Sequence, residues 1–381
     1  MSVVGDFEKP ALRHAPIDVP EATLEDLRSR LSATRWPKAL EAEGWRYGLD
    51  AKELKELCDY WRDGFDWRVQ EARLNSFPLY LAEVDGLDIH FWRIKSPAPG
   101  ARPLLLLHGW PGSIMEFLEL LGPLSNPAAH NAPGAPAFDL VVPSLPGFGF
   151  GGQPSERGWT ALRVAQALHR LMFETLGYTS YLIQGGDWGT IVGGQMARLF
   201  PAHIQKLHIN MPFANPPAGV APSPEWARRM EAETGYLHLQ NTKADALTMG
   251  MSDSPAGLAG WILEKFRSWS DCGGDVFSAF GKDALLANIM FYWASNSIAS
   301  STRIYCETAI NGIDPFGGGK VTVPTGIAEF PAEPYIAPRS WLEATYTIQH
   351  YTVMDRGGHF AAMEQPQLLL EDIRRFFGAG A

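Results

Sequence analysis

Cysteine is scarce in this sequence, and its spacing matches no known metal or disulfide pattern. The three cysteines, Cys58, Cys272 and Cys306, are an odd number at wide spacing. No CxxC pair and no HExxH motif occurs, so the sequence indicates neither a disulfide framework nor a zinc site. We therefore expect no metal and no other cofactor, and a reducing cytoplasm suits these thiols.

Excess positive charge and long apolar runs are also absent. The 32 Lys and Arg are outnumbered by 42 Asp and Glu, which gives a formal net charge of −10. Nucleic acids and anionic membranes attract clustered Lys and Arg, so neither is an expected partner. No stretch approaches the roughly 18 apolar residues of a membrane span, and residues 1–16 lack the apolar core of a signal peptide. The sequence predicts a soluble, cytoplasmic protein, with a homodimer left open.

Apolar and aromatic residues are abundant instead. Hydrophobic residues make up 46% of the 381, enough for one large core and a smaller attached unit. Two strand-like runs flank Asp85-Gly86 in residues 79–95, which is a hairpin signal. Strands then alternate with helices, as in a mostly parallel sheet with helices on both faces. The expected strands are 103–107, 138–142, 181–184 and 204–209, with an amphipathic helix at 161–176.

Two segments fall outside this alternation. Residues 1–77 place apolar side chains at helical spacing, which predicts a helical arm packed around a larger body. Residues 213–320 are helix-like and rich in aromatics, and strands resume at 321–323 and 345–353 before a last amphipathic helix at 368–377. An insertion between two sheet strands predicts a lid over the carboxyl edge of the sheet. The predicted division is arm 1–77, core 78–212 with 321–381, and lid 213–320.

The central motif is Gly185-Gly186-Asp187-Trp188-Gly189, between a predicted strand and a helical run. It matches the G-x-nucleophile-x-G elbow, with an aspartate at the nucleophile position. Its glycines suit a tight turn whose backbone is strained. The alternative is an ordinary turn in which Asp187 caps the following helix, and the motif alone would favour that alternative.

A second motif, His108-Gly-Trp110-Pro-Gly112, directly follows the strand at 103–107. In an elbow architecture this loop supplies one backbone N–H of an oxyanion hole. We expect the Trp110 amide in that role, with the Trp188 amide as its partner. The side chains of Trp110, Trp188 and Phe213 are expected to contact substrate, and His108 is expected to serve packing.

A third motif, Arg356-Gly-Gly-His359-Phe360, comes late in the chain. Nucleophile, acid and histidine in this order are typical of the α/β-hydrolase triad. We choose Glu333 as the acid, with Glu329, Asp355 and Asp314 as competitors. Each motif is modest alone, but the ordered set predicts an α/β-hydrolase fold: a mostly parallel central sheet with a helical lid insertion and an N-terminal helical arm.

These motifs resemble those of the microsomal and juvenile-hormone type epoxide hydrolases. The resemblance extends over nearly the whole chain, including 235–240, 253–259, 262–266, 323–326 and the N-terminal arm. It implies that Asp187 is the nucleophile, Glu333 the acid and His359 the base. Tyr236 and Tyr305 match the family's two lid tyrosines, although without the resemblance we would interpret both as lid core residues. The N-terminal anchor of the membrane-bound members is not expected here.

The residue types favour epoxide opening. A carboxylate is already ionised, and its attack at an sp³ carbon leaves a stable ester that water activated by His359 can hydrolyse. An epoxide oxygen needs a proton donor as it leaves, which two phenols supply, whereas a halide does not. The sequence thus predicts a cofactor-independent epoxide hydrolase whose partners are a small apolar epoxide and water. Haloalkane or haloacid dehalogenation and ligand binding without catalysis are the two alternatives.

Overall fold

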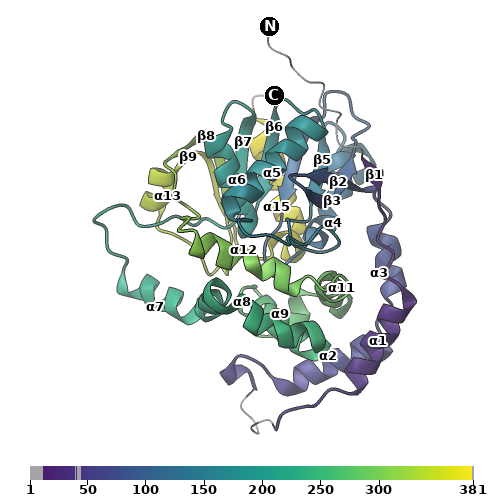
Figure 1. Cartoon of the computed structure of the whole chain (residues 1–381). Coiled ribbons are helices and arrows are strands. Elements are labelled where there is room, and N and C mark those ends of the chain that lie inside the picture. The colour runs from purple at the N-terminus through teal and green to yellow at the C-terminus, as the bar shows by residue number, and fades with distance from the viewer. Residues whose placement is uncertain (1–11, 39, 41–43, 380–381) are drawn as a thin grey trace.

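The computed structural model describes residues 12–38, 40 and 44–379, so residues 1–11 of the expected arm lie outside the described residues. Nine strands form one sheet in the order β1-β2-β3-β5-β4-β6-β7-β8-β9 (Figure 1). The pairs among β4 to β9 are parallel, whereas β1–β2, β2–β3 and β3–β5 are antiparallel. The strands are β1 (Arg13–His14), β2 (Leu79–Val84), β3 (Leu87–Ile94), β4 (Arg102–Leu107), β5 (Phe138–Pro143), β6 (Tyr181–Gly185), β7 (Ile204–Ile209), β8 (Val321–Glu329) and β9 (Tyr346–Val353).

The expected strands are confirmed, and β8 is longer than the three residues predicted for it. The hairpin between β2 and β3 turns at Asp85 and Gly86, whose φ angles are 57° and 75°. Two consecutive positive φ angles are what the favoured two-residue hairpin turn requires. The mostly parallel sheet places the ends of β4 and β6 side by side, which brings the two loops that follow them together.

Helices cover both faces of the sheet (Figure 1). Helices α5 and α6 lie on one face and pack on each other, and α4 and α15 do so on the opposite face. The helix expected at 161–176 is α-helical only to Arg170; its end widens into a π-helical turn because the Leu176 amide donates five residues back to Leu171. These helices are α4 (Leu118–Ser125), α5 (Ala161–Arg170), α6 (Trp188–Leu199) and α15 (Pro366–Gly378), and the short ones are η1 (Gly44–Tyr47), η2 (Ile114–Phe117), η3 (Pro127–His130), η4 (Leu171–Thr175), α13 (Arg339–Thr345) and α14 (Ala361–Glu364).

Six helices stand between β7 and β8, where the sequence predicts a lid. They lie together at one end of the sheet (Figure 1). Helix α12 packs along α8, and α9 contacts both α8 and α11. Their bounds are α7 (Pro224–Glu233), α8 (Gly235–Asp253), α9 (Pro255–Ser268), α10 (Val276–Ala279), α11 (Lys282–Trp293) and α12 (Ile298–Ile310).

The N-terminal helices α1 (Glu21–Ser32), α2 (Ala51–Asp63) and α3 (Trp67–Leu74) run from the edge strand β1 round to the lid (Figure 1). Arg30 forms an ion pair with Asp253 at 2.5 Å, and the Tyr60 hydroxyl donates to Asp283 at 2.6 Å. The arm therefore contacts the lid as well as the sheet. The boundaries at 77, 212 and 320 stay predictions.

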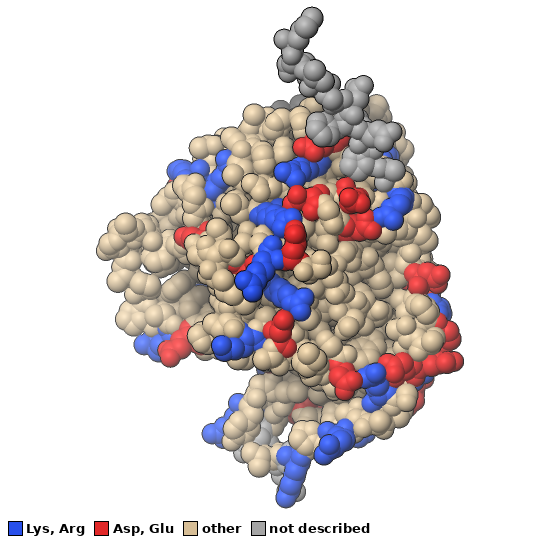
Figure 2. All heavy atoms as spheres, in the orientation of Figure 1, with Lys and Arg blue, Asp and Glu red and all other residues tan. Residues whose placement is uncertain are grey.

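The surface carries both signs of charge. On the face seen in Figure 2, Lys and Arg are interspersed with Asp and Glu rather than gathered by sign. None of the described helices has an apolar stretch long enough to cross a bilayer. The cytoplasmic location and the homodimer stay predictions.

Candidate active site

Asp187 lies in a strained turn between β6 and α6. Its φ and ψ angles are 49° and −123°, a region that residues with a Cβ rarely adopt. The turn is tight on both sides, because a Cβ on Gly189 would lie 2.0 Å from the Leu107 carbonyl oxygen, and one on Gly185 would lie 2.5 Å from the Gly189 backbone. These glycines allow the turn, and the turn presents Asp187 at the end of β6.

The carboxylate of Asp187 is turned away from helix α6. Although Asp187 is the N-cap residue, its side chain accepts no hydrogen bond from the helix. Its Oδ1 instead accepts the Trp110 amide at 2.8 Å, and its Oδ2 lies 3.5 Å from Nε2 of His359. A Cβ on Gly109 would come within 2.1 Å of that Oδ1, which explains the glycine of this loop. The helix-cap alternative is therefore wrong. Among the described residues, the Trp188 amide makes no hydrogen bond to this carboxylate.

His359 and Glu333 form a buried pair beside Asp187. Nδ1 of His359 lies 2.8 Å from Oε2 of Glu333, and the Tyr335 amide donates to Oε1 at 3.0 Å. His359 is 5% exposed and Glu333 is 1% exposed, so water does not screen the pair. The competing acids are engaged elsewhere: Glu329 accepts the Tyr351 hydroxyl, Asp355 pairs with Arg356, and Asp314 accepts the Asn215 amide.

The surroundings of His359 favour its charged form. Burial alone would lower the pKa of the imidazole, but the carboxylates of Glu333 and Asp187 together outweigh burial and hold the pKa well above its usual range. With Glu333 on Nδ1, the other ring nitrogen, Nε2, faces Asp187. The ring is therefore oriented for proton transfer at the Asp187 carboxylate.

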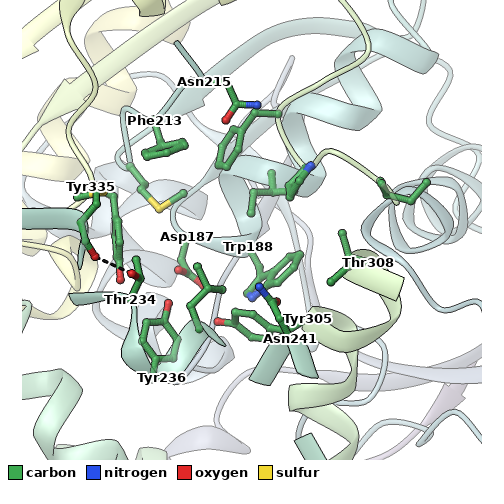
Figure 3. A pocket seen from close by; sticks show the side chains of 18 residues that line it. Asp187, Trp188, Phe213, Asn215, Thr234, Tyr236, Asn241, Tyr305, Thr308 and Tyr335 are labelled. Atoms are coloured by element: carbon green, nitrogen blue, oxygen red, sulfur yellow. Dashed lines mark hydrogen bonds between the residues drawn. The ribbon is translucent and has the colours of Figure 1, made fainter. Parts of the chain in front are cut away.

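A cavity of about 370 Å³ opens above Asp187, between the end of β6 and the lid (Figure 3). Tyr236 from α8 and Tyr305 from α12 direct their hydroxyls toward the Asp187 carboxylate. Burial raises the pKa of each phenol well above its usual range, and the Asp187 charge raises both further, so each stays protonated. The lining residues are Asp187, Trp188, Ile191, Met211, Phe213, Asn215, Met230, Thr234, Tyr236, Leu237, Asn241, Tyr305, Thr308, Ala309, Ile313, Pro315, Phe316 and Tyr335.

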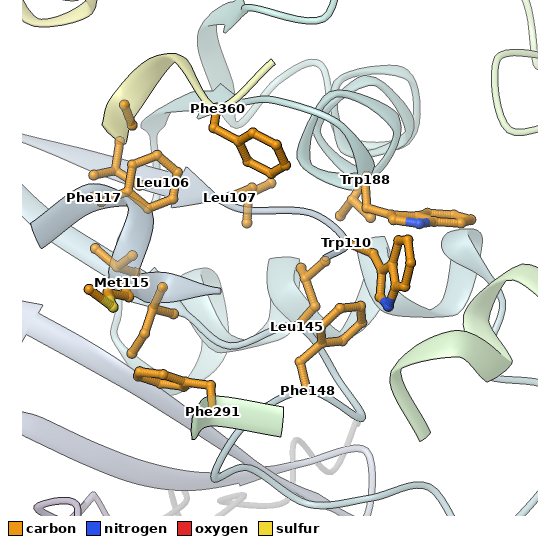
Figure 4. Close-up of a cluster of buried hydrophobic side chains, with 14 of the residues drawn as sticks. Leu106, Leu107, Trp110, Met115, Phe117, Leu145, Phe148, Trp188, Phe291 and Phe360 are labelled. Carbon is orange, nitrogen blue, oxygen red and sulfur yellow. The ribbon is translucent and has the colours of Figure 1, made fainter. Parts of the chain in front are cut away.

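The three aromatic residues expected at the substrate differ in position. Trp188 and Phe213 line the cavity. Trp110 does not: its fully buried indole stacks on the ring of Tyr236, with ring centres 5.4 Å apart and planes 8° apart, and it belongs to the buried cluster that also contains Phe148 (Figure 4). Substrate contact by the Trp110 side chain is therefore not supported, and only its amide reaches the site. His108 packs as expected, with Nε2 accepting the Leu145 amide at 3.1 Å.

Sequence reasoning missed three residues around Tyr236 and His359. Tyr335 lines the cavity and donates through its hydroxyl to the Glu233 carbonyl at 3.3 Å. Trp269 accepts the His359 amide at its carbonyl, at 2.8 Å, and Lys265 lies over the Tyr236 ring. Tyr335 follows Glu333 by two residues, which was the available signal for it. No signal in the sequence indicates Trp269 or Lys265, because the positions of both depend on how α9 crosses the site.

In the part of the chain that the structure describes, no group of three or more His, Cys, Asp or Glu could hold a metal ion. The arrangement is instead that of a carboxylate with an amide donor, a histidine with its acid, and two phenols that share one apolar cavity. This set can attack a small electrophile, protonate its leaving oxygen and activate water.

Known proteins resemble this chain in sequence and in fold. The sequence model described as epoxide hydrolase N terminus matches residues 12–117, and that described as alpha/beta hydrolase fold matches residues 102–233. A putative epoxide hydrolase of Stigmatella aurantiaca is 44% identical over 371 residues, which are 95% of this chain and 83% of the relative. This chain belongs to the epoxide hydrolase family. The hydrolase is thus an enzyme of the family that its motifs resemble.

Other relatives of the hydrolase agree. Epoxide hydrolase 1 of Sus scrofa is 35% identical over 97% of this chain and 89% of its own length. The crystal structure of juvenile hormone epoxide hydrolase from the silkworm Bombyx mori superposes with a TM-score of 0.87 at 32% identity, covering 97% of this chain and 95% of that one. The predicted α/β-hydrolase fold is confirmed.

Proposed function

We propose that this hydrolase converts small apolar epoxides to vicinal diols through an ester on Asp187. The observation that carries the proposal is the placement of one carboxylate. Its Oδ1 is held by the Trp110 amide, its Oδ2 faces His359, and it lines the cavity beneath two phenols. The apolar lining of that cavity suits a hydrophobic epoxide of modest size.

In the first step, Oδ2 of Asp187 attacks an epoxide carbon and the carbon–oxygen bond of the ring breaks. Tyr236 or Tyr305 donates its proton to the leaving oxygen, which becomes the first hydroxyl of the diol. Oδ1 keeps its hydrogen bond to the Trp110 amide. The product is an ester between Asp187 and the opened substrate, and this step requires no base because the nucleophile is already an anion.

In the second step, water attacks the carboxyl carbon of that ester. The phenol that gave up its proton in the first step recovers one from His359, which leaves the imidazole neutral. His359 then takes a proton from the water, and Glu333 stabilises the imidazolium that forms. The negative charge develops on Oδ1, where the Trp110 amide stabilises it, and we include the Trp188 amide as a second donor. The ester bond then breaks, and the second oxygen of the diol takes the proton held by His359 and leaves. The proton that remains on the carboxyl group of Asp187 passes to His359, so Asp187 is restored as a carboxylate with one oxygen from water.

A dehalogenase would use the same nucleophile, and the Trp188 indole in the cavity is the feature that favours it. A halide leaves as a stable anion and needs no acid. Two buried phenols kept protonated beside Asp187 favour an oxygen leaving group. A protein that only bound its ligand would not need the His359–Glu333 pair. Because burying that pair costs free energy, its presence favours catalysis over ligand binding alone.

The test is a single turnover with excess enzyme in ¹⁸O-labelled water. We expect the label in Asp187 and none in the first diol, since water attacks the carboxyl carbon. His359→Gln should trap the ester, which mass spectrometry detects as the added mass of the substrate. Label in the first diol, or epoxide turnover by Asp187→Ala at the parent rate, would contradict the proposal. Halide release from haloalkanes without diol from epoxides would favour the dehalogenase.

A further inference from the structure

Lys265 on helix α9 is a buried cation next to the site that the proposed mechanism does not use. The residue is 6% exposed. Its Nζ lies 4.8 Å from the ring centre of Tyr236 and 5.2 Å from that of Trp269, and it forms an ion pair with Glu264 at 2.6 Å. Burying an ammonium group costs free energy that packing alone does not return. Its position over these two rings therefore needs a reason.

The rings under Lys265 connect Tyr236 to the histidine. Trp269 lies 5.1 Å from Tyr236 and 4.9 Å from His359, centre to centre. Its carbonyl accepts the His359 amide at 2.8 Å. A Cβ on Gly358 would lie 2.5 Å from that carbonyl oxygen, so the histidine loop fits closely against Trp269. Lys265 and Trp269 therefore both contact the Tyr236 ring, and Trp269 also contacts His359.

We infer that Lys265 is a positioning residue that holds Tyr236 in place and makes it a better proton donor during epoxide opening. When Tyr236 gives up its proton, negative charge develops on the phenol and spreads into the ring that faces the ammonium group. A cation over an aromatic face attracts that charge, and the attraction is strong where water is excluded. The charge is fixed beforehand, so nothing must reorganise as the bond breaks.

The inference rests on the proposed function and concerns only the first of its two steps, the formation of the ester. Ester formation places negative charge at the phenols. Ester hydrolysis places it on Oδ1 of Asp187, which the Trp110 amide holds. Removing the ammonium group should therefore slow formation of the ester more than its hydrolysis. A residue that served only packing would affect both steps together.

The experiment measures the two steps separately by mass spectrometry. Ester formation is followed in His359→Gln, where the adduct accumulates, and ester decay in the enzyme with His359 intact. We expect Lys265→Met to form the adduct about tenfold more slowly, equivalent to about 1.4 kcal/mol of barrier, and to hydrolyse it at the parent rate. Lys265→Arg keeps a cation and should restore most of the rate. Lys282→Met is the matched control, since Lys282 also lies over two rings, those of Tyr60 and Phe277, at 5.6 and 5.1 Å.

Three results would overturn the inference: adduct formation by Lys265→Met at the parent rate, equal slowing of both steps, or no recovery with Lys265→Arg. If Lys265→Met does not fold, Lys265→Gln is compared with Lys265→Arg in the same two assays. Failure of the proposed function would look different. In that case His359→Gln with Lys265 intact would form no adduct at all.

Discussion

The buried pair of Glu333 and His359 allows the hydrolysis step to be isolated by one substitution. Glu333→Gln keeps the size of the side chain and an oxygen that can accept the Tyr335 amide. It removes the negative charge of the Glu333 carboxylate, whose Oε2 lies 2.8 Å from Nδ1 of His359. Only the second step uses His359 as a base, so only that step should lose rate.

The magnitude follows from the geometry. Two unit charges about 4 Å apart, the distance between the charge centres of such a pair, interact by about 4 kcal/mol at an effective dielectric constant of about 20. That loss of support for the imidazolium slows hydrolysis by about a thousandfold, since about 1.4 kcal/mol is a factor of ten. Ester formation needs no base and should change by less than about threefold.

The assay is rapid quenching followed by mass spectrometry of the intact protein. The ester should form at the parent rate in Glu333→Gln and then persist. Hydrolysis requires neutral imidazole, so its rate rises with pH through the pKa of His359. Loss of the Glu333 charge lowers that pKa, and the rising limb should move to lower pH. Glu329→Gln is the control and should leave both steps unchanged. Equal slowing of both steps, or hydrolysis at the parent rate, would refute the reasoning.

Three further predictions concern the fold and the charges that support the site. Asp372→Asn should lower the free energy of unfolding by about 3 kcal/mol in chemical denaturation, because it breaks a buried pair with His208 at 2.9 Å. Burial would raise the pKa of Asp372, but its hydrogen bonds outweigh burial and lower it, so this stabilisation is present at neutral pH and is lost as pH falls below about 4. Gly189→Ala should cost about 3 kcal/mol or more in the same assay, since its Cβ would lie 2.0 Å from a carbonyl oxygen. Asp187→Asn should lower the pKa of His359, as measured by NMR titration of the ring, because one of the two charges that raise it is gone.

The sequence was informative where backbone geometry dictates residue type. Gly185 and Gly189 mark a turn in which a Cβ would collide with the backbone, and Asp85-Gly86 marks a turn with two positive φ angles. These requirements are local, so they are visible in a string of residues. The order of Asp187, Glu333 and His359 was equally visible, because each follows a strand of one sheet whose topology restricts where the connecting loops can meet.

The rest depended on how the lid crosses the sheet. The motif could not distinguish a helix cap from a nucleophile at Asp187; in the structure its carboxylate accepts the Trp110 amide and does not cap helix α6. Nothing local separates the Trp110 indole, which packs behind Tyr236, from the Trp188 indole, which lines the cavity. Lys265 has an ordinary surface residue type at an ordinary helical spacing. Its burial follows from the packing of α9 against α8, a contact between helices that no local pattern encodes.

The charge of Asp187 couples the two proposed steps. Before reaction, Asp187 and Glu333 both help His359 to keep its proton, against burial. Ester formation removes the negative charge of Asp187. The pKa of His359 then falls, because burial lowers it and only the Glu333 charge still raises it, so the imidazole binds its proton less tightly. In the same step a phenol loses a proton to the epoxide oxygen and must recover one. In the proposed mechanism, formation of the ester on Asp187 therefore makes His359 a base at the moment when the ester requires one, because the proton that His359 releases returns to the phenol.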